Sequence, residues 1–456
     1  MNWPRQVAGV SVFLLLVPII LGGLSVSGCK SATQVIVEPD PRVFTLFAGL
    51  VAVGYGEGQA DPSFESLRTQ LKEALADWTP DDLYPMTRLE ENYRPDQLVA
   101  ATLKLGPPPD FSSDGQSLVG LQHFLVTVWK DVEPLYKTNS AAESRELATM
   151  AGPAEAAIQR AIDYARGGAP YKAWRVVPEA LALPGCAYGY RDESGRTVWV
   201  IVGRPPGSWE RDLAREAFRV VMHDELAGLE TEGDLGRFEP VLERARFVPA
   251  VRERYPEEMP VPGMPGYVEE NVDALLEYVE ENLVLAVTAR TVDSANGEAA
   301  VGEAAKSGFF LAPGLSKGLA NYEASGKTLT GYLGTLLEGA DVQAALALAP
   351  AYTWEKVSLP WWYGWTREAW LLTVSVPGKL RAELTGEATN FPPIEGLPVV
   401  SGWGTEEWGL FTTDQTITCL PDWSGVAIPA GGRIWIVERD SLTGPNEPPP
   451  LEFVPE

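Results

Sequence analysis

The sequence predicts an α+β protein in which a mostly helical domain is followed by a smaller β-rich domain. Apolar residues recur at helical spacing over residues 43–349. From residue 350 onward the pattern changes to short runs of β-branched and aromatic residues, separated by proline and glycine turns. Nine of the 15 tryptophans lie between Trp354 and Trp435. We therefore expect a helical domain at 43–349 and a β-rich, tryptophan-rich domain at 350–456.

Periodicity also places the individual elements. The stretches of the first domain with the apolar spacing of an amphipathic helix are 64–78, 118–136, 154–166, 209–230, 268–292 and 315–323. The third of them starts after Gly152-Pro153, a pair that normally interrupts helices. Two alternating runs, Tyr188–Tyr190 and Thr197–Val202, flank a turn at Asp192–Gly195 and predict a hairpin. The strands expected in the second domain are 370–376, 380–384 and 433–438.

Composition limits the classes of partner and chemistry. With 45% hydrophobic and 21% charged residues, the chain of 456 residues is typical of a globular protein with a sizeable core. Its net charge of −26, from 62 acidic and 36 basic residues, argues against nucleic acid as a partner. The chain has only 2 histidines, His123 and His223, which restricts histidine-based metal sites and catalytic triads.

The N-terminus has the layout of a bacterial lipoprotein signal. Arg5 precedes an apolar run at Val7–Leu21, and Val26-Ser27-Gly28 then leads to Cys29, the pattern of a branched residue and two small ones before an acylated cysteine. We therefore expect a signal peptide at 1–28, lipid on Cys29 and a polar tether at 29–42. Attached acyl chains contribute about 0.8 kcal/mol per buried CH₂. The expected location is the cell membrane or outer membrane, on its extracytoplasmic side.

The alternative is an uncleaved helical anchor, because the apolar segment approaches the ~20 residues that span a bilayer. Pro18 and a glycine pair weaken that helix.

Two further cysteines, Cys186 and Cys419, remain once Cys29 carries lipid. An extracytoplasmic compartment permits disulfides. The two thiols can therefore form one bridge between the domains, provided that their Cα atoms lie close enough.

A candidate metal site lies on the predicted helix at 209–230. Zinc peptidase helices carry two histidines at i and i+4 and a carboxylate beside the first as general base. His223 and Asp224 occupy the first two places, but Ala227 stands where the second histidine belongs. Asp224 is also one methylene shorter than the usual glutamate. A histidine–acid pair on an amphipathic helix usually has a structural role.

Several segments occur in the order and spacing of a known family. They are Phe44–Tyr55, Leu121–Leu125, the helix around His223, Glu280–Arg290 and Ser307–Leu315. Over residues 43–341 the chain resembles a bacterial family of unknown function, predicted to be extracytoplasmic gluzincin-like metallopeptidases. The resemblance implies a mostly helical, zincin-like core, with His223 on the zinc-binding helix and Glu281 in the position of the downstream glutamate ligand.

The implied ligand set is incomplete. A catalytic zinc site normally has three protein ligands, and only His223 and Glu281 are retained. Asp224, Glu225 or Glu230 can replace the third, in a site better suited to harder cations than zinc. We therefore expect no cofactor and a non-catalytic binding or scaffolding role at the envelope, with peptide or protein as partner. An active zinc metallopeptidase with an atypical ligand set is the enzyme alternative.

A cell-wall glycan is the other candidate partner. Exposed indoles stack on sugar rings, and the tryptophans that can form such a platform are Trp361, Trp362, Trp365, Trp403 and Trp408. The same residues can instead fill the core of the β-rich domain, as large apolar rings usually do.

Overall fold

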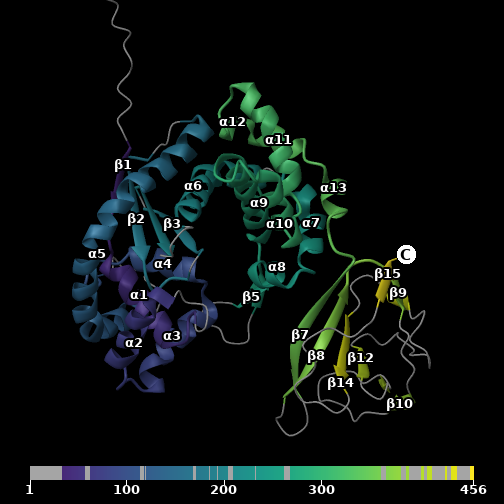
Figure 1. Cartoon of the computed structure of the whole chain (residues 1–456), viewed down its shortest axis with the longest axis horizontal. Coiled ribbons are helices and arrows are strands. Elements are labelled where there is room, and N and C mark those ends of the chain that lie inside the picture. Colours follow the sequence, from purple (N-terminus) through teal and green to yellow (C-terminus); the bar gives the residue numbers. More distant parts are fainter. Residues whose placement is uncertain are drawn as a thin grey trace, which may run out of the picture.

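The computed structural model confirms a mixed α+β protein in which helices predominate up to residue 346 and strands predominate from residue 352 (Figure 1). It describes residues 33–56, 62–112, 118, 120–167, 171–183, 185–192, 194–203, 209–231, 233–260, 268–360, 366–381, 387–389, 402–404, 408–412, 427–428, 433–438 and 452–455. No helix of these described residues is both long enough and apolar enough to cross a bilayer.

The helices follow one another through the first three quarters of the chain. They are α1 (Pro41–Ala52), α2 (Glu65–Ala74), α3 (Pro80–Asn92), α4 (Pro95–Leu103), α5 (Leu121–Ala165), α6 (Trp209–Thr231), α7 (Glu239–Ala245), α8 (Pro249–Arg254), α9 (Ala274–Thr291), α10 (Gly297–Lys306), α11 (Ala312–Ser325), α12 (Thr330–Glu338) and α13 (Val342–Leu346), with 3₁₀ turns at Pro62–Phe64 and Gly236–Phe238.

A four-stranded sheet lies among the helices. Its strands are β1 (Gln34–Val37), β2 (Ala173–Glu179), β3 (Ala187–Arg191) and β4 (Thr197–Gly203), in the order β1-β2-β4-β3. Strands β1, β2 and β4 are parallel, whereas β3 is an antiparallel edge strand. The predicted β3–β4 hairpin is confirmed. Its turn is held by the Asp192 carboxylate, which accepts the backbone N–H groups of Arg196 and Thr197 at 3.0 and 3.2 Å.

The remaining strands are short or belong to the C-terminal part. They are β5 (Glu258–Pro260), β6 (Val268–Glu270), β7 (Tyr352–Pro360), β8 (Thr366–Val374), β9 (Gly378–Arg381), β10 (Glu387–Thr389), β11 (Gly402–Gly404), β12 (Trp408–Thr412), β13 (Ala427–Ile428), β14 (Arg433–Glu438) and β15 (Glu452–Pro455). An antiparallel sheet runs β10-β11-β12-β14-β8-β7. Because α13 ends at Leu346 and β7 begins at Tyr352, the change from helix to strand falls where the sequence predicts it.

Helix α5 corrects one sequence expectation. The two helices predicted at 118–136 and 154–166 are parts of a single helix of 45 residues that continues through Pro134 and Pro153. A proline inside a helix removes one hydrogen bond and crowds the preceding turn. Burial offsets this cost, because the first part of α5 packs into one apolar core and the last part into another.

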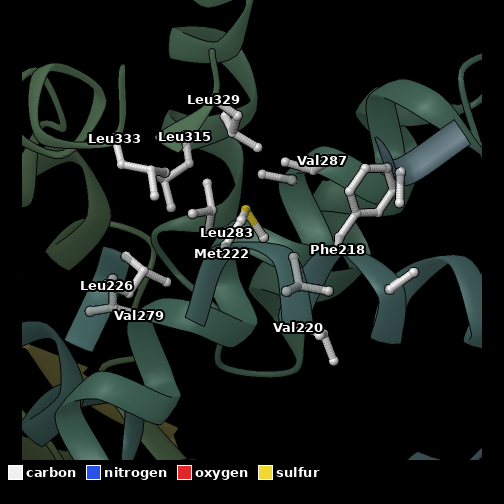
Figure 2. Packing of buried hydrophobic residues seen from close by; sticks show 14 of the residues in the cluster. Phe218, Val220, Met222, Leu226, Val279, Leu283, Val287, Leu315, Leu329 and Leu333 are labelled. Carbon is white, nitrogen blue, oxygen red and sulfur yellow. The ribbon is translucent and has the colours of Figure 1, made fainter. Parts of the chain in front are cut away.

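These two cores divide the helical part. The first contains α1, α4 and the start of α5, and the second contains the end of α5 with α6, α9 and α11. In the second core the apolar side of α6 meets the apolar side of α9 (Figure 2). The side chains that make this contact region include Phe218, Met222, Leu226, Val279, Leu283 and Val287. This packing fixes the rotation of α6 about its own axis, and therefore which of its polar residues face α9.

Candidate functional site

A cleft of about 760 Å³ lies where α6, α9 and the edge strand β3 meet. The start of α4 and the end of α8 complete its walls. Its lining is unusually rich in charge for a cavity. The charged residues are the arginines Arg94, Arg191, Arg215, Arg219 and Arg254, the carboxylates Asp96, Asp212, Glu216, Asp224, Glu277 and Glu280, and His223.

The periodicity of α6 explains why three of these residues share a wall. Arg215, Arg219 and His223 follow one another at intervals of four, so they lie along one side of the helix. Phe218 and Met222 lie on the other side, in the core (Figure 2). The adjacent side of α9 presents Glu277, Glu280 and Glu281 toward α6, and the first two of these line the cleft.

Glu281 is the centre of the densest ionic cluster. Its side chain is fully buried, and its carboxylate accepts hydrogen bonds from three guanidinium groups. Arg215 donates to Oε1 and Arg219 to Oε2, and Arg254 donates to Oε2 at 2.9 Å. A buried carboxylate is tolerated only when it is paired and hydrogen-bonded in this way. Burial, together with repulsion from Arg219 and Arg254, lowers the pKa of Arg215 to about 10.

The predicted site residue His223 contacts the neighbouring carboxylate rather than Glu281. Its Nδ1 lies 3.0 Å from Glu280 Oε1, and its side chain remains half-exposed. The hydrogen bond to Glu280 raises the pKa of His223 and outweighs the opposing effect of burial. Asp224, the candidate general base, is exposed and pairs with Arg191. The structure therefore does not bring His223, Asp224 and Glu281 together around one point.

The other candidate ligands do not complete a site. His123 is exposed on α5 and is not part of the cleft lining, and Glu225 is exposed on α6. Glu230 lies two turns beyond His223 and is also outside the lining. Among the residues that the structure describes, no group of three or more His, Cys, Asp or Glu side chains is arranged to hold a metal ion.

Zinc does not fit the side chains around Glu281. A zinc site needs ligands with free lone pairs, namely imidazole, thiolate or carboxylate. The groups that converge on Glu281 are three cations that can only donate hydrogen bonds. They occupy both carboxylate oxygens and would repel a dication. We therefore derive no chemistry through a metal at this cleft.

Sequence reasoning overlooked Arg215, Glu216 and Arg219. Their spacing, with a glutamate after the first of two residues at i and i+4, is that of the zinc peptidase motif with both histidines replaced by arginine. Glu216 Oε1 accepts the backbone N–H of Gly189 on β3 at 2.9 Å, and Oε2 lies 3.3 Å from Arg219 Nε. Burial raises the pKa of Glu216. The spacing alone could not have singled them out, because a glutamate between any two residues at i and i+4 occurs at many places in so acidic a chain.

An ion pair joins the two walls of the cleft. Arg94, which caps α4 from the first core, donates to both carboxylate oxygens of Glu277 on α9, each at 2.7 Å. Such two-point pairing is the strongest geometry between a guanidinium and a carboxylate. It links the two cores directly beside the cavity.

Other predicted residues fall partly outside the described chain. Cys29, Cys419 and the tryptophans Trp361, Trp362 and Trp365 lie outside the described residues. Trp403 and Trp408 belong to the backbone of β11 and β12, but their side chains are outside the description. Cys186 lines the cleft and forms no disulfide with any described residue. The bridge to Cys419 and the glycan platform therefore stay predictions.

The chain matches no protein-family model, no curated protein and no solved structure. The function is therefore inferred from the geometry of the cleft and from the pattern of the sequence.

Proposed function

We propose that this protein is a lipid-anchored lipoprotein of the bacterial envelope whose helical domain carries a peptidase-like cleft that binds peptide without cutting it. The observation that carries this proposal is the convergence of Arg215 and Arg219 on Glu281. In a zinc peptidase, the corresponding residues would be two histidines and a downstream glutamate, all bound to the metal.

Two guanidinium groups supply the positive charge that a zinc ion would supply, and they satisfy the same buried carboxylate. They cannot supply the chemistry. Zinc polarises a carbonyl and lowers the pKa of a bound water molecule to about 7, whereas a guanidinium has no open coordination position. Glu216, in the place of the general base, is already engaged by Gly189 and Arg219. The buried carboxylate of such a site thus stays paired with positive charge, without the hydrolytic machinery.

The edge strand β3 favours peptide as the ligand. Within the described sheet, β3 pairs with β4 on one side only, and residues 185–191 line the cleft. The edge of a sheet is a template on which an extended peptide adds as a further strand. The Gly189 N–H in the middle of this edge already bonds to Glu216, so the peptide would pair with the edge on either side of that bond.

Zinc binding by an engineered variant tests the proposed origin of the site. Arg215→His combined with Arg219→His recreates the His-Glu-x-x-His spacing opposite Glu281. Arg254 keeps 43% of its side chain exposed and can turn away from Glu281. We expect the double variant to bind close to one zinc ion per chain, as measured by elemental analysis after dialysis, and the matched Arg215→Gln/Arg219→Gln variant to bind none.

The same zinc measurement on the unmodified protein can overturn the proposal. Near-stoichiometric zinc that is lost in His223→Ala, together with proteolysis blocked by a chelator, would show an active peptidase and overturn the proposal. A double-histidine variant that folds but takes up no zinc would refute the motif assignment.

Membrane attachment has its own test. We expect Cys29→Ala to abolish labelling by a radioactive fatty acid in the producing cell, because the thiol that accepts the lipid is gone. Cys186→Ala is the control and keeps the label. Persistent labelling of Cys29→Ala would show that the N-terminal segment is not a lipoprotein signal.

A further inference from the structure

Three residues that line the cleft each have a buried polar atom without a hydrogen-bond partner. Tyr255 is 1% exposed, and its hydroxyl makes no hydrogen bond; Arg215 Nε and Arg219 Nε are buried and make none either. A buried polar group without a partner costs about 1–3 kcal/mol. Because all three residues line the same cavity, a group of a ligand is the simplest missing partner.

The residues with unpaired groups all lie at the Glu281 cluster. The guanidinium carbon of Arg254 is 5.4 Å from the centre of the Tyr255 ring, and Arg254 and Arg215 share the carboxylate of Glu281. Burial raises the pKa of the Tyr255 hydroxyl, and the charges of Arg254, Arg219 and Arg215 oppose this rise in part. Donors from α6 and from the end of α8 therefore surround one part of the cavity.

This part of the cleft holds a cluster of arginines. Three guanidinium groups share Glu281, and Glu216 offsets part of their charge because its Oε2 lies 3.3 Å from Arg219 Nε, which leaves one net positive charge among these five side chains. The low pKa of Arg215 has the same origin, since repulsion from its two neighbours adds to burial. A single negative charge on a ligand would relieve that repulsion and satisfy the unpaired donors.

The rest of the lining sets a limit on the ligand's charge. Glu216, Glu277 and Glu280 line the same cavity and repel a group that carries two or more negative charges. A carboxylate, with one negative charge and two acceptor oxygens, fits this environment better than a phosphate does. The adjacent strand edge of β3 independently favours an extended peptide.

We infer that the cleft selects peptides through one carboxylate, which Arg215, Arg254 and the Tyr255 hydroxyl bind. This inference rests on the proposed peptide-binding function and adds its chemical specificity. The carboxylate has two possible sources, the C-terminus of a chain or the side chain of an Asp or Glu residue.

Three libraries of fluorescent random pentapeptides separate these sources. All are N-acetylated. The first has a central Gln and an amidated C-terminus, the second replaces that Gln by Glu, and the third keeps Gln but has a free C-terminal carboxylate. Binding to the purified full-length protein in detergent is measured by fluorescence anisotropy. We expect at least one carboxylate library to bind roughly tenfold or more tightly than the neutral library, the ratio typical of a charged hydrogen bond.

Variants connect that preference to the named residues. Tyr255→Phe keeps the ring and removes the unpaired hydroxyl, so the preference falls about threefold, and Arg215→Gln lowers it about tenfold. The control is Arg290→Gln, because Arg290 pairs with Glu323 outside the cleft lining and its loss leaves the preference unchanged. Melting temperatures of all variants establish that they remain folded.

The outcomes distinguish this inference from the function on which it rests. Equal binding of the three libraries overturns carboxylate selection but leaves peptide binding intact. No binding of any library overturns both. A carboxylate preference that survives in both Tyr255→Phe and Arg215→Gln refutes the assigned residues, and displacement of peptide by inorganic phosphate more readily than by acetate refutes the assigned charge.

Discussion

Glu281→Gln is the most informative single substitution in the helical domain. The side chain of Glu281 is 0% exposed, and three guanidinium groups donate to it. Glutamine has nearly the same shape and volume, so the substitution removes charge without creating a cavity. Removing one partner of a buried ionic cluster leaves the other charges unpaired, which costs about 3–5 kcal/mol. We expect a loss of stability in this range.

Urea unfolding followed by far-ultraviolet circular dichroism measures the loss, because that signal reports on the helices. Glu323→Gln is the matched control. Glu323 also accepts hydrogen bonds from an arginine, Arg290, but its side chain is 35% exposed. Such a partly solvated pair contributes only about 0–1 kcal/mol. The two substitutions change the same functional group in different surroundings.

The pairing itself predicts a partial rescue. Removing one guanidinium as well, in Glu281→Gln/Arg219→Gln, reduces the repulsion among the remaining cations and restores part of the lost stability. If Glu281→Gln is within about 1 kcal/mol of the unmodified protein, the buried cluster does not exist in solution as described. An additive double variant would likewise refute direct coupling between the two residues.

Two other substitutions test the cleft. Because the hydrogen bond to Glu280 raises the pKa of His223, the pair stabilises the fold below the unfolded pKa of about 6.5 and this contribution disappears as pH rises through the higher folded pKa. His223→Gln should therefore lower the melting temperature at acidic pH and change it little at alkaline pH; a difference that grows with pH would contradict this. Gly189→Ala places a Cβ 2.5 Å from Glu216 Oε1, so thermal unfolding should show a loss of about 1–3 kcal/mol. Gly228→Ala has no neighbour within 4 Å and should gain up to about 1 kcal/mol, and equal effects of the two would argue against the close approach of β3 to α6.

Local patterns predicted most elements around the site, although the helix predicted at 268–292 begins only at Ala274, after the short strand β6 (Val268–Glu270). The periodicity at 209–230 corresponds to α6 (Trp209–Thr231), and the Asp192 turn corresponds to the β3–β4 hairpin. Both depend on interactions within a few residues along the chain. The break expected at Gly152-Pro153 did not occur, because burial in two separate cores holds α5 together across the proline.

The candidate site was predicted only in part. Residue chemistry pointed to His223, since histidine is a common zinc ligand, and the resemblance pointed to Glu281. Which residues of α6 face Glu281 on α9 could not be read from the sequence. Arginine is not a metal ligand, so nothing in residue type connected Arg215 and Arg219 with a zinc motif.

By itself, the sequence determined that a mostly helical part precedes a part made of strands. It also determined that the β3–β4 hairpin turns at Asp192, and that α6 has one apolar and one charged side. These properties follow from the side-chain spacing of single elements. Only the tertiary structure decided that Arg215 and Arg219, rather than His223, meet Glu281. Arg215, Arg219 and His223 lie on the same side of α6, so the axial position of α6 against α9, which their apolar packing sets, decides which of them reaches Glu281; a shift of one turn along the axis would exchange the residues that meet.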